Sequence, residues 1–444
     1  MFFVFFHVGI GLMATVFREA MVIYFFMVVS YLLYRVFSLP NKHLEVLIAT
    51  SYIVGAEVFF RMTKAYFLYE TGKYMVIVFL VIGMFYNGFK RSSLTYVTYL
   101  LLLLPGVYIS FLNQEFDTTF RQTILFNLSG PLCLTAAAMY CYGRSLKLKE
   151  FFTCLNFMIY PLISMTIYIY FYNVNIRDVI TGTASTSATS GGYGPNQVAT
   201  ILGLGVFILY SRFLIPYKNK LVHLVMMFML LAFTHRAIIT FSRGGVFVGI
   251  IMVVVFTIIY YFISKIRTKF VITSRVVAVL GACIAIWTFS VLQTGGLIAN
   301  RYANKDALGR EKEDVTTGRV HLVNADLKAF SKYPVFGLGV GRSSVFYEEE
   351  LNIELPSHNE VSRMLSEHGL LGILALLILL FAPLVTKLNG RKNIYFYPFI
   401  IFWLLTIAHS SMRIAAPAFI YGLSLLNIDY GKKETPVHRE QIEK

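Results

Sequence analysis

The longest polar segment of the chain, residues 295–363, reads GGLIANRYANKDALGREKEDVTTGRVHLVNADLKAFSKYPVFGLGVGRSSVFYEEELNIELPSHNEVSR. It stands alone among apolar runs, because most of the remaining chain alternates hydrophobic stretches with short connectors. A loop of this length without low complexity is more often functional than idle. We therefore expect residues 295–363 to fold into a cap over a lipid-facing cavity, with the chemistry beneath it.

The composition indicates a membrane protein, because 57% of the 444 residues are hydrophobic and only 14% are charged. Soluble domains carry about 25% charged residues, and a transmembrane helix needs roughly 20 apolar residues. We predict an all-α polytopic membrane helix bundle of about 12–14 transmembrane helices with one large, partly helical extracytoplasmic loop. The candidate spans are 1–17, 20–37, 44–60, 73–89, 94–112, 123–142, 151–172, 195–215, 221–241, 244–264, 271–293, 364–386, 394–408 and 410–428.

Basic residues are spaced regularly along this pattern and account for much of the net charge of +16. Two candidate spans separate each basic connector from the next. Lys and Arg are retained on the cytoplasmic side of membranes, so we place these connectors and both termini there, and the 295–363 loop opposite. A nucleic-acid partner does not fit, because the basic residues form no single folded face. The connectors are 90–91, 144–149, 212–220, 265–275, 387–392 and 432–433.

Four regions follow from this topology. They are an N-terminal transmembrane bundle (1–293), a periplasmic loop capping the active site (294–363), C-terminal transmembrane helices (364–430) and a cytoplasmic tail (431–444). The first span lacks a basic flank and a small-residue cleavage site, so we expect it to remain uncleaved, with a signal-like or re-entrant segment as the alternative. The four cysteines lack metal-ligand and CxxC spacing, so we expect buried thiols and no metal site.

Six arginines lie on or near the predicted outer face, against the retention bias. Charge at membrane depth is costly and tends to be functional, and the planar fork of arginine suits phosphate. Several arginines on one face therefore indicate an anionic, phosphate-like ligand, although each one alone is equally explained as a loop or snorkelling arginine. They are Arg236, Arg243, Arg319, Arg342, Arg363 and Arg413.

Two predicted helix starts lie on the same outer face. Pro195 begins an apolar run and suits a first helical turn, which places Asn196 where free backbone amides favour an anion; simple capping is the alternative. Two long spans meet at Ser242-Arg243-Gly244-Gly245. This segment predicts a tight outer turn with Arg243 at its apex and Ser242 as a candidate cap of the next helix.

Within the loop, a helix is predicted from Thr317 to just before Pro334. Arg319 falls in its first turn, where the helix dipole does not favour a cation. Its partner is expected to be Glu311, Glu313 or a ligand phosphate. The glycine-spaced residues 334–341 lack the lysine of a phosphate loop, so we interpret them as close backbone packing. The helix carries an apolar stripe expected to pack inward, formed by Val320, Val323, Leu327 and Phe330.

His358, just before the span that begins near residue 364, is the predicted proton acceptor, because imidazole titrates near neutral pH. Asn359 or Glu360 is expected to orient it, and a helix-cap role is the alternative. Nearby arginines lower its pKa, and Glu360 or Glu367 raises it. Activity is expected to rise with pH through a titration near neutrality.

Together these segments resemble the O-antigen ligase and O-antigen polymerase superfamily of bacterial envelope glycosyltransferases, over roughly residues 190–385. The chain lacks the tryptophan often found in that family shortly after the position of Arg319. The matching motifs are Gly194-Pro195-Asn196-Gln197, Ser242-Arg243-Gly244-Gly245, Thr317-Gly318-Arg319, Tyr333-Pro334-Val335-Phe336-Gly337-Leu338-Gly339, Ser357-His358-Asn359-Glu360 and Glu367-His368-Gly369-Leu370-Leu371-Gly372.

The resemblance implies a metal-independent, inverting transferase without a cofactor, on the periplasmic side of the bacterial inner membrane. The donor would be a glycan on undecaprenyl pyrophosphate, and the acceptor a sugar hydroxyl, on lipid A core or on another lipid-linked glycan. By this analogy Arg243 and Arg319 hold the pyrophosphate and His358 assists attack. Arg236, Asn196, Arg342, Arg363, Glu360 and Arg413 are the other candidate substrate-binding residues. The motifs favour a ligase over a polymerase, and a polysaccharide flippase or transporter is a weaker alternative because no internal repeat is evident.

Overall fold

The computed structural model describes residues 1–66, 68–113, 118–172, 175–180, 182–215, 219–314, 316, 318–352 and 357–431. In chain order its elements are α1 (Phe2–Val16), α2 (Ala20–Ser38), α3 (Glu45–Met62), α4 (Thr71–Asn87), η1 (Arg91–Leu94), α5 (Thr95–Leu101), α6 (Leu104–Asn113), α7 (Thr118–Cys141), β1 (Ser145–Lys147), α8 (Leu148–Tyr172), η2 (Ile176–Asp178), η3 (Ala188–Ser190), α9 (Pro195–Leu214), α10 (Lys220–Ile239), α11 (Arg243–Ile263), α12 (Ile266–Gln293), α13 (Leu297–Tyr302), α14 (Arg319–Lys332), α15 (Ser343–Leu351), α16 (Glu360–Leu388), α17 (Phe396–Ser410), α18 (Ala416–Ser424) and β2 (Asn427–Asp429).

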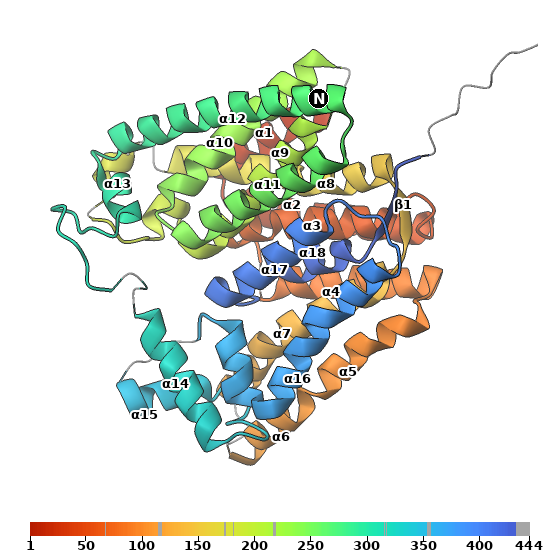
Figure 1. Ribbon diagram of the computed structural model, residues 1–444, viewed down its shortest axis with the longest axis vertical. Helices are drawn as coiled ribbons and strands as arrows, with labels where there is room; N and C mark the ends of the chain where they lie inside the picture. Colours follow the sequence, from red (N-terminus) through yellow and green to blue (C-terminus); the bar gives the residue numbers. More distant parts are fainter. Residues whose placement is uncertain are drawn as a thin grey trace, which may run out of the picture.

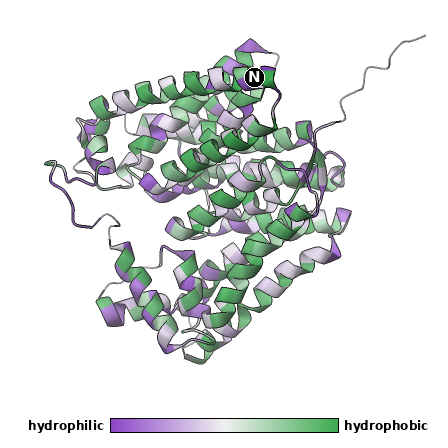
Figure 2. Ribbon diagram, in the orientation of Figure 1, coloured by the Kyte–Doolittle hydropathy of each residue, from purple (hydrophilic) through white to green (hydrophobic). Residues whose placement is uncertain are grey.

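The fold is an all-α, multi-pass membrane bundle (Figure 1), and each predicted apolar run contains a helix. In the described part of the chain, nine helices are long and apolar enough to cross a membrane, and three shorter apolar helices accompany them. The remaining runs are α3, which carries charged side chains, and α18, which has nine residues. Figure 2 shows hydrophobic residues along the long helices and hydrophilic ones in the loop before α14 and in α15.

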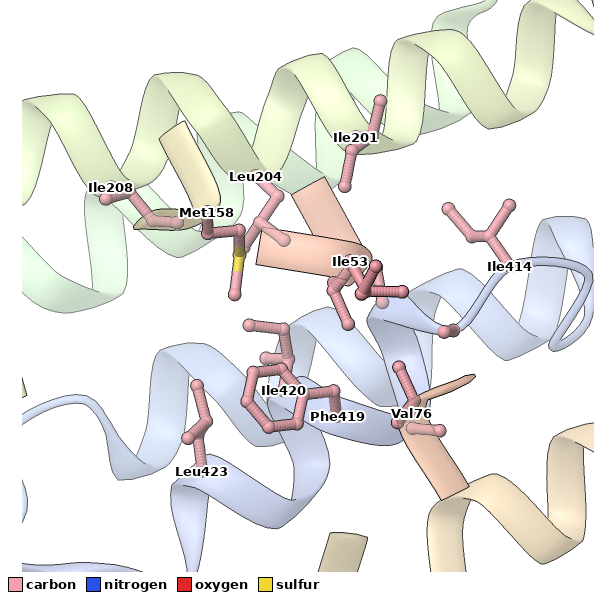
Figure 3. Close-up of a cluster of buried hydrophobic side chains, with 14 of the residues drawn as sticks. Ile53, Val76, Met158, Ile201, Leu204, Ile208, Ile414, Phe419, Ile420 and Leu423 are labelled. Atoms are coloured by element: carbon pink, nitrogen blue, oxygen red, sulfur yellow. The ribbon is translucent and has the colours of Figure 1, made fainter. Parts of the chain in front are cut away.

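Helices α3, α9 and α18 form the centre of the bundle and are buried along almost their whole length, whereas α12 lies at its outside. Figure 3 shows Ile53 of α3, Ile201 of α9 and Phe419 of α18 meeting in this core. Lipid is as apolar as these side chains, so helix association depends on close packing and polar bonds. Glu57 of α3 provides one such bond, because its Oε2 accepts from the backbone N–H of Ala415 at 2.7 Å.

One end of the bundle gathers the basic connectors. The side chain of Arg144 donates to the carbonyl of Gly88, and that of Arg275 donates to the carbonyls of Phe213 and Leu214. Strands β1 and β2 pair in parallel with Ser145 opposite Asn427, which brings the segment after α18 to the same end. These contacts join the basic connector at 144–149 to the one at 90–91 and to the segment after α18, and join the one at 265–275 to the end of α9; the predicted connector 432–433 lies outside the described residues.

The connectors without that basic bias meet at the other end (Figure 1). Arg177 Nε donates to the carbonyl of Gln293 at 3.0 Å, and Lys312 Nζ donates to Thr183 Oγ1 at 2.8 Å. The large loop and the 175–194 connector therefore share one end of the molecule. The two ends group the connectors as the charge pattern predicted; which end faces the cytoplasm stays a prediction.

Helices α14 and α15 of the large loop pack against the start of α16. Asp326 joins all three, because it accepts from Tyr347 Oη at 2.6 Å and from Ser362 Oγ at 2.5 Å. Because of these two hydrogen bonds, the face of α14 that carries Asp326 packs inward. The predicted apolar stripe is therefore wrong at Val320 and Leu327, which are 49% and 44% exposed, whereas Val323 and Phe330 are half-buried. The side chains that pack inward are Leu322, Ala325 and Ala329.

The glycine-spaced segment 334–341 fastens the loop to the membrane helices. The backbone N–H of Leu338 donates to the carbonyl of Ser366 at 2.8 Å, and that of Val340 donates to the carbonyl of Gly106 at 3.1 Å. Gly337 has φ +75°, and a Cβ there would lie 2.3 Å from the carbonyl carbon of Glu367. Only glycine tolerates both conditions, so the interpretation as close backbone packing is confirmed.

Candidate functional site: an arginine cluster at the outer helix starts

Helices α9 and α11 begin side by side at the loop-bearing end. The first starts at Pro195 as predicted, and the second starts at Arg243 after a tight turn in which Phe241 has φ +58°. Ser242 does not cap α11; its Oγ donates instead to Asn196 Oδ1 at 2.7 Å, which corrects the capping prediction. The bond joins the two helix starts and leaves the first-turn amides of α11 without a side-chain cap, an arrangement that favours an anion.

Four arginines converge on these helix starts, and we call them the arginine cluster: Arg243, Arg301, Arg319 and Arg413. Arg243 Nη1 donates to the carbonyl of Arg301 at 3.4 Å, and Arg301 Nε donates to the carbonyl of Phe241 at 3.0 Å. Burial and then the charge of Arg243 lower the pKa of both Arg301 and Arg319. The cluster thus draws on α11, α13, α14 and the 411–415 segment.

Three of the four arginines in the cluster lack an ion-paired carboxylate within the described part of the chain. Among the described residues, no ion pair joins Arg301, Arg319 or Arg413 to a carboxylate. The predicted pairing of Arg319 with Glu311 or Glu313 is accordingly not found there. Buried charge is costly unless paired, so an anionic ligand would stabilise this arrangement. In the same described part of the chain, no group of three or more His, Cys, Asp or Glu side chains is placed to hold a metal.

His358 lies at the edge of the cluster. Burial, followed by the charges of Arg413 and Arg319, lowers the pKa of His358 to about 4. The expectation of a titration near neutrality is therefore wrong for the ligand-free protein, and His358 is neutral at pH 7. Neither predicted neighbour orients its ring: Asn359 Oδ1 caps α16 by accepting from the backbone N–H of Val361 at 2.9 Å, and Glu360 pairs with an arginine.

Arg363 and Glu360 belong to a different, charge-compensated group. The Arg363 guanidinium donates to Glu360 Oε1 at 2.5 Å, to Glu367 Oε2 at 2.9 Å and to Asn127 Oδ1 at 2.7 Å. All three charged side chains are buried. This network joins α7 to the first half of α16. It uses the N–H donors of Arg363, which the sequence analysis had assigned to substrate binding.

Arg342 and Arg236 have their contacts outside the arginine cluster. Arg342 lines a separate cavity of about 450 Å³ beside Tyr333. Arg236 of α10 is buried, with its guanidinium 3.8 Å from the ring centroid of Tyr170. The structure thus brings together Asn196, Arg243, Arg319, Arg413 and His358 of the predicted set. Arg236 and Arg342 lie elsewhere, whereas Arg363 and Glu360 border Arg413 in a small cavity that Ser357 also lines.

The sequence analysis missed three groups in this site: Arg301, Tyr302 and His409. His409 Nδ1 donates to the carbonyl of Leu405 at 2.7 Å, so Nε2 carries the lone pair; it is buried and has no partner among the described residues. A Cβ on Gly244 would lie 2.5 Å from His409 Cδ2, so the glycine lets this ring approach Arg243. For His409, the sequence offered one indication of a role in the site, which is its position in the predicted outer turn between spans 394–408 and 410–428.

Residues 224–377 match a family described as O-antigen ligase. No curated protein matches the chain. The matched segment runs from α10 into α16. It contains three members of the arginine cluster and His358, and it includes the whole folded loop. This match supports the resemblance to the O-antigen ligase superfamily over residues 224–377.

Proposed function

We propose that this protein transfers a glycan from undecaprenyl pyrophosphate to a sugar hydroxyl, as an O-antigen ligase does. The observation that carries the proposal is the arginine cluster, in which Arg301, Arg319 and Arg413 lack an ion-paired carboxylate among the described residues. A pyrophosphate would supply the missing negative charge. Arginine binds phosphate oxygens in a bidentate manner, which gives orientation as well as energy.

In the proposed reaction the acceptor oxygen attacks the anomeric carbon, and the bond from that carbon to the pyrophosphate oxygen breaks. The bonding electrons leave with undecaprenyl pyrophosphate, and the configuration inverts. The developing charge falls on the leaving oxygens, where fixed donors such as Arg243 and Arg319 are worth most. The hydroxyl proton passes to His358, which is neutral at pH 7 and therefore able to accept it.

Ligand binding would also restore the basicity of His358. Its pKa is held low partly by Arg413 and Arg319. A pyrophosphate lying against these two guanidinium groups opposes their effect, since a nearby negative charge favours the imidazolium. The donor thereby prepares the base that the next step requires.

A polymerase that joins lipid-linked repeat units is the second candidate, because it needs the same donor chemistry. It differs in the acceptor, which would be another lipid-linked glycan instead of lipid A core. We further propose that the arginine cluster faces the periplasm and both termini the cytoplasm, following the basic connectors. Single cysteines at Lys305 and Lys147 should then label from opposite sides of the membrane.

The function is tested with purified protein in lipid vesicles and a glycan on undecaprenyl pyrophosphate. We expect release of undecaprenyl pyrophosphate and a product of inverted anomeric configuration, and loss of both in His358→Ala with donor binding retained. A longer lipid-linked glycan as the product would identify a polymerase. Movement of intact donor across the vesicle without bond cleavage would instead identify a transporter and overturn the proposal.

A further inference from the structure

A cavity of about 730 Å³ lies outside the arginine cluster, between the outer ends of α4 and α7 and the starts of α15 and α16. Hydroxyl and amide side chains line it together with aromatic rings, among them Gln122, Thr123, Ser344, Tyr69 and Phe126. Its volume is within the range of small-molecule sites, about 300–1,000 Å³. A mixture of this kind suits a ligand with both hydroxyl groups and apolar faces.

The cations in the wall of this cavity are already paired. Arg363 is bonded to two carboxylates, Glu367 and Glu360, and Glu70 Oε2 lies 2.6 Å from Lys73 Nζ. An anionic ligand would find no free cation among these groups, and removing it from water would be costly. The wall therefore favours an uncharged polar molecule over an anion, in contrast to the arginine cluster.

Tyr69 presents a fixed aromatic surface to the cavity. Its side chain is half exposed, and the Arg61 guanidinium lies 4.2 Å from its ring centroid. Its hydroxyl is 3.2 Å from that of Tyr193. These contacts hold the ring in place, and a held ring loses little entropy when a ligand stacks on it.

The cavity reaches the edge of the catalytic region through Ser357. This residue lines the cavity, its carbonyl accepts from Arg413 Nη2 at 3.3 Å, and His358 follows it in the chain. In Figure 1 three helices that border the cavity, α7, α15 and α16, lie below α17, whereas α11 and α13 lie above it. His358 therefore follows a cavity-lining residue in the chain and lies close enough to Arg413 and Arg319 for their charges to lower its pKa.

We propose that this cavity binds the saccharide that accepts the transferred glycan. The acceptor hydroxyl must lie beside the base and apart from the leaving group; the cavity adjoins His358 through Ser357, and the arginine that lines it is Arg363, which is not a member of the arginine cluster. The inference rests on the proposed function and adds to it a neutral acceptor site with Tyr69 as its stacking surface and Gln122 and Ser344 as polar contacts.

The test blocks the cavity by covalent labelling of a cysteine introduced in its wall. Ser344→Cys is introduced with Cys283→Ser, because Cys283 is the one partly exposed native thiol and the other three are buried; a bulky fluorescein maleimide then fills the site. Ser331→Cys, exposed on α14, is the matched control. Two readouts are compared: transfer onto the acceptors present in the cell's own membrane vesicles, and binding of undecaprenyl pyrophosphate to the purified protein.

We expect labelled Ser344→Cys to lose transfer by about 10²-fold, the usual cost of a misplaced reactant, while binding of undecaprenyl pyrophosphate stays unchanged. Labelled Ser331→Cys should retain both. In addition, Tyr69→Ala should raise the acceptor concentration needed for half-maximal transfer, and Tyr69→Phe should restore it. Normal transfer after labelling at residue 344 would overturn the acceptor site, as would loss of undecaprenyl pyrophosphate binding. Failure of the unmodified protein to bind undecaprenyl pyrophosphate would overturn the proposed function itself.

Discussion

Arg319 and Arg363 lie at the same end of the molecule but in opposite electrostatic surroundings. Arg363 is buried and bonded to two carboxylates on its own helix, three residues before and four residues after it. Arg319 has no ion pair among the described residues, and two further arginines lower its pKa together with burial. The comparison indicates that an arginine at this end can bind a ligand only where no carboxylate of the fold is already paired with it.

The energetic consequences of the two arrangements differ in kind. Removing one partner of a buried ion pair leaves an uncompensated charge and destabilises the fold. Removing one member of a cluster of like charges relieves repulsion. The Arg363 network should therefore respond to mutation through stability, and the arginine cluster through activity.

The largest expected effect is that of Arg363→Ala, because Glu360 and Glu367 would remain buried without a cation. We expect a loss of about 3–5 kcal/mol in the free energy of unfolding, measured as loss of folded protein and a lower unfolding temperature in detergent. Replacing all three charges together, by Met at 363 and Gln at 360 and 367, should recover most of it. The exposed pair Arg310–Asp306 is the control, and its removal should leave the unfolding temperature nearly unchanged because solvent screens such pairs. A stable Arg363→Ala protein that no longer binds donor would place Arg363 in the ligand site instead.

Arg319→Ala should reduce transfer by about 10²–10³-fold, the usual cost of one fixed donor to a developing oxyanion. Its unfolding temperature should not fall, because the change relieves repulsion from Arg243 and Arg413. Lysine should rescue poorly, since a point charge lacks the bidentate fork, and Arg243→Ala should behave in the same way. Arg342→Ala, at the separate cavity, serves as the comparison. Equal losses of transfer in Arg342→Ala and Arg319→Ala would contradict the separation of the arginine cluster from that cavity.

The pH dependence of transfer should report His358. The neutral ring is the active form and its pKa is about 4 in the ligand-free protein. Activity should therefore be level across neutral pH and fall as pH decreases through about 4 in plots of kcat/KM. The midpoint in kcat should lie higher, because bound pyrophosphate offsets Arg413 and Arg319. A low-pH limb that persists in His358→Gln would assign the titration to another group.

The smallest expected effect is that of chelation. We expect transfer to continue unchanged in EDTA, because the arginine cluster supplies the positive charge that a divalent ion would otherwise bring to the pyrophosphate. Initial rates with and without EDTA provide the measurement, with Arg319→Ala as the low-activity reference. Loss of transfer that Mg²⁺ or Mn²⁺ restores would show that the cluster is insufficient by itself.

The sequence did not divide the two arginines in this way. The spacing of Arg363 from Glu360 and Glu367 allows them to pair on one helix, but the sequence analysis assigned Arg363 and Glu360 to the substrate. Arg301 and His409 were not identified, because they meet Arg243 and Arg319 only through contacts between distant segments. The packing face of α14 was also assigned wrongly. Asp326 is buried because it accepts hydrogen bonds from Tyr347 and Ser362, which lie on other helices.

By itself the sequence determined that this is a multi-pass helical membrane protein, where its helices lie and how its connectors divide between two ends. It could do so because span length, hydropathy and charge bias are local properties of the chain. It also placed Arg243, Arg319 and His358 in one candidate site through short motifs. Only the tertiary structure decided which arginines keep their charge uncompensated, what lowers the pKa of His358, and where a neutral cavity adjoins the site. These properties depend on distances between side chains far apart in the chain, and no local pattern encodes those distances.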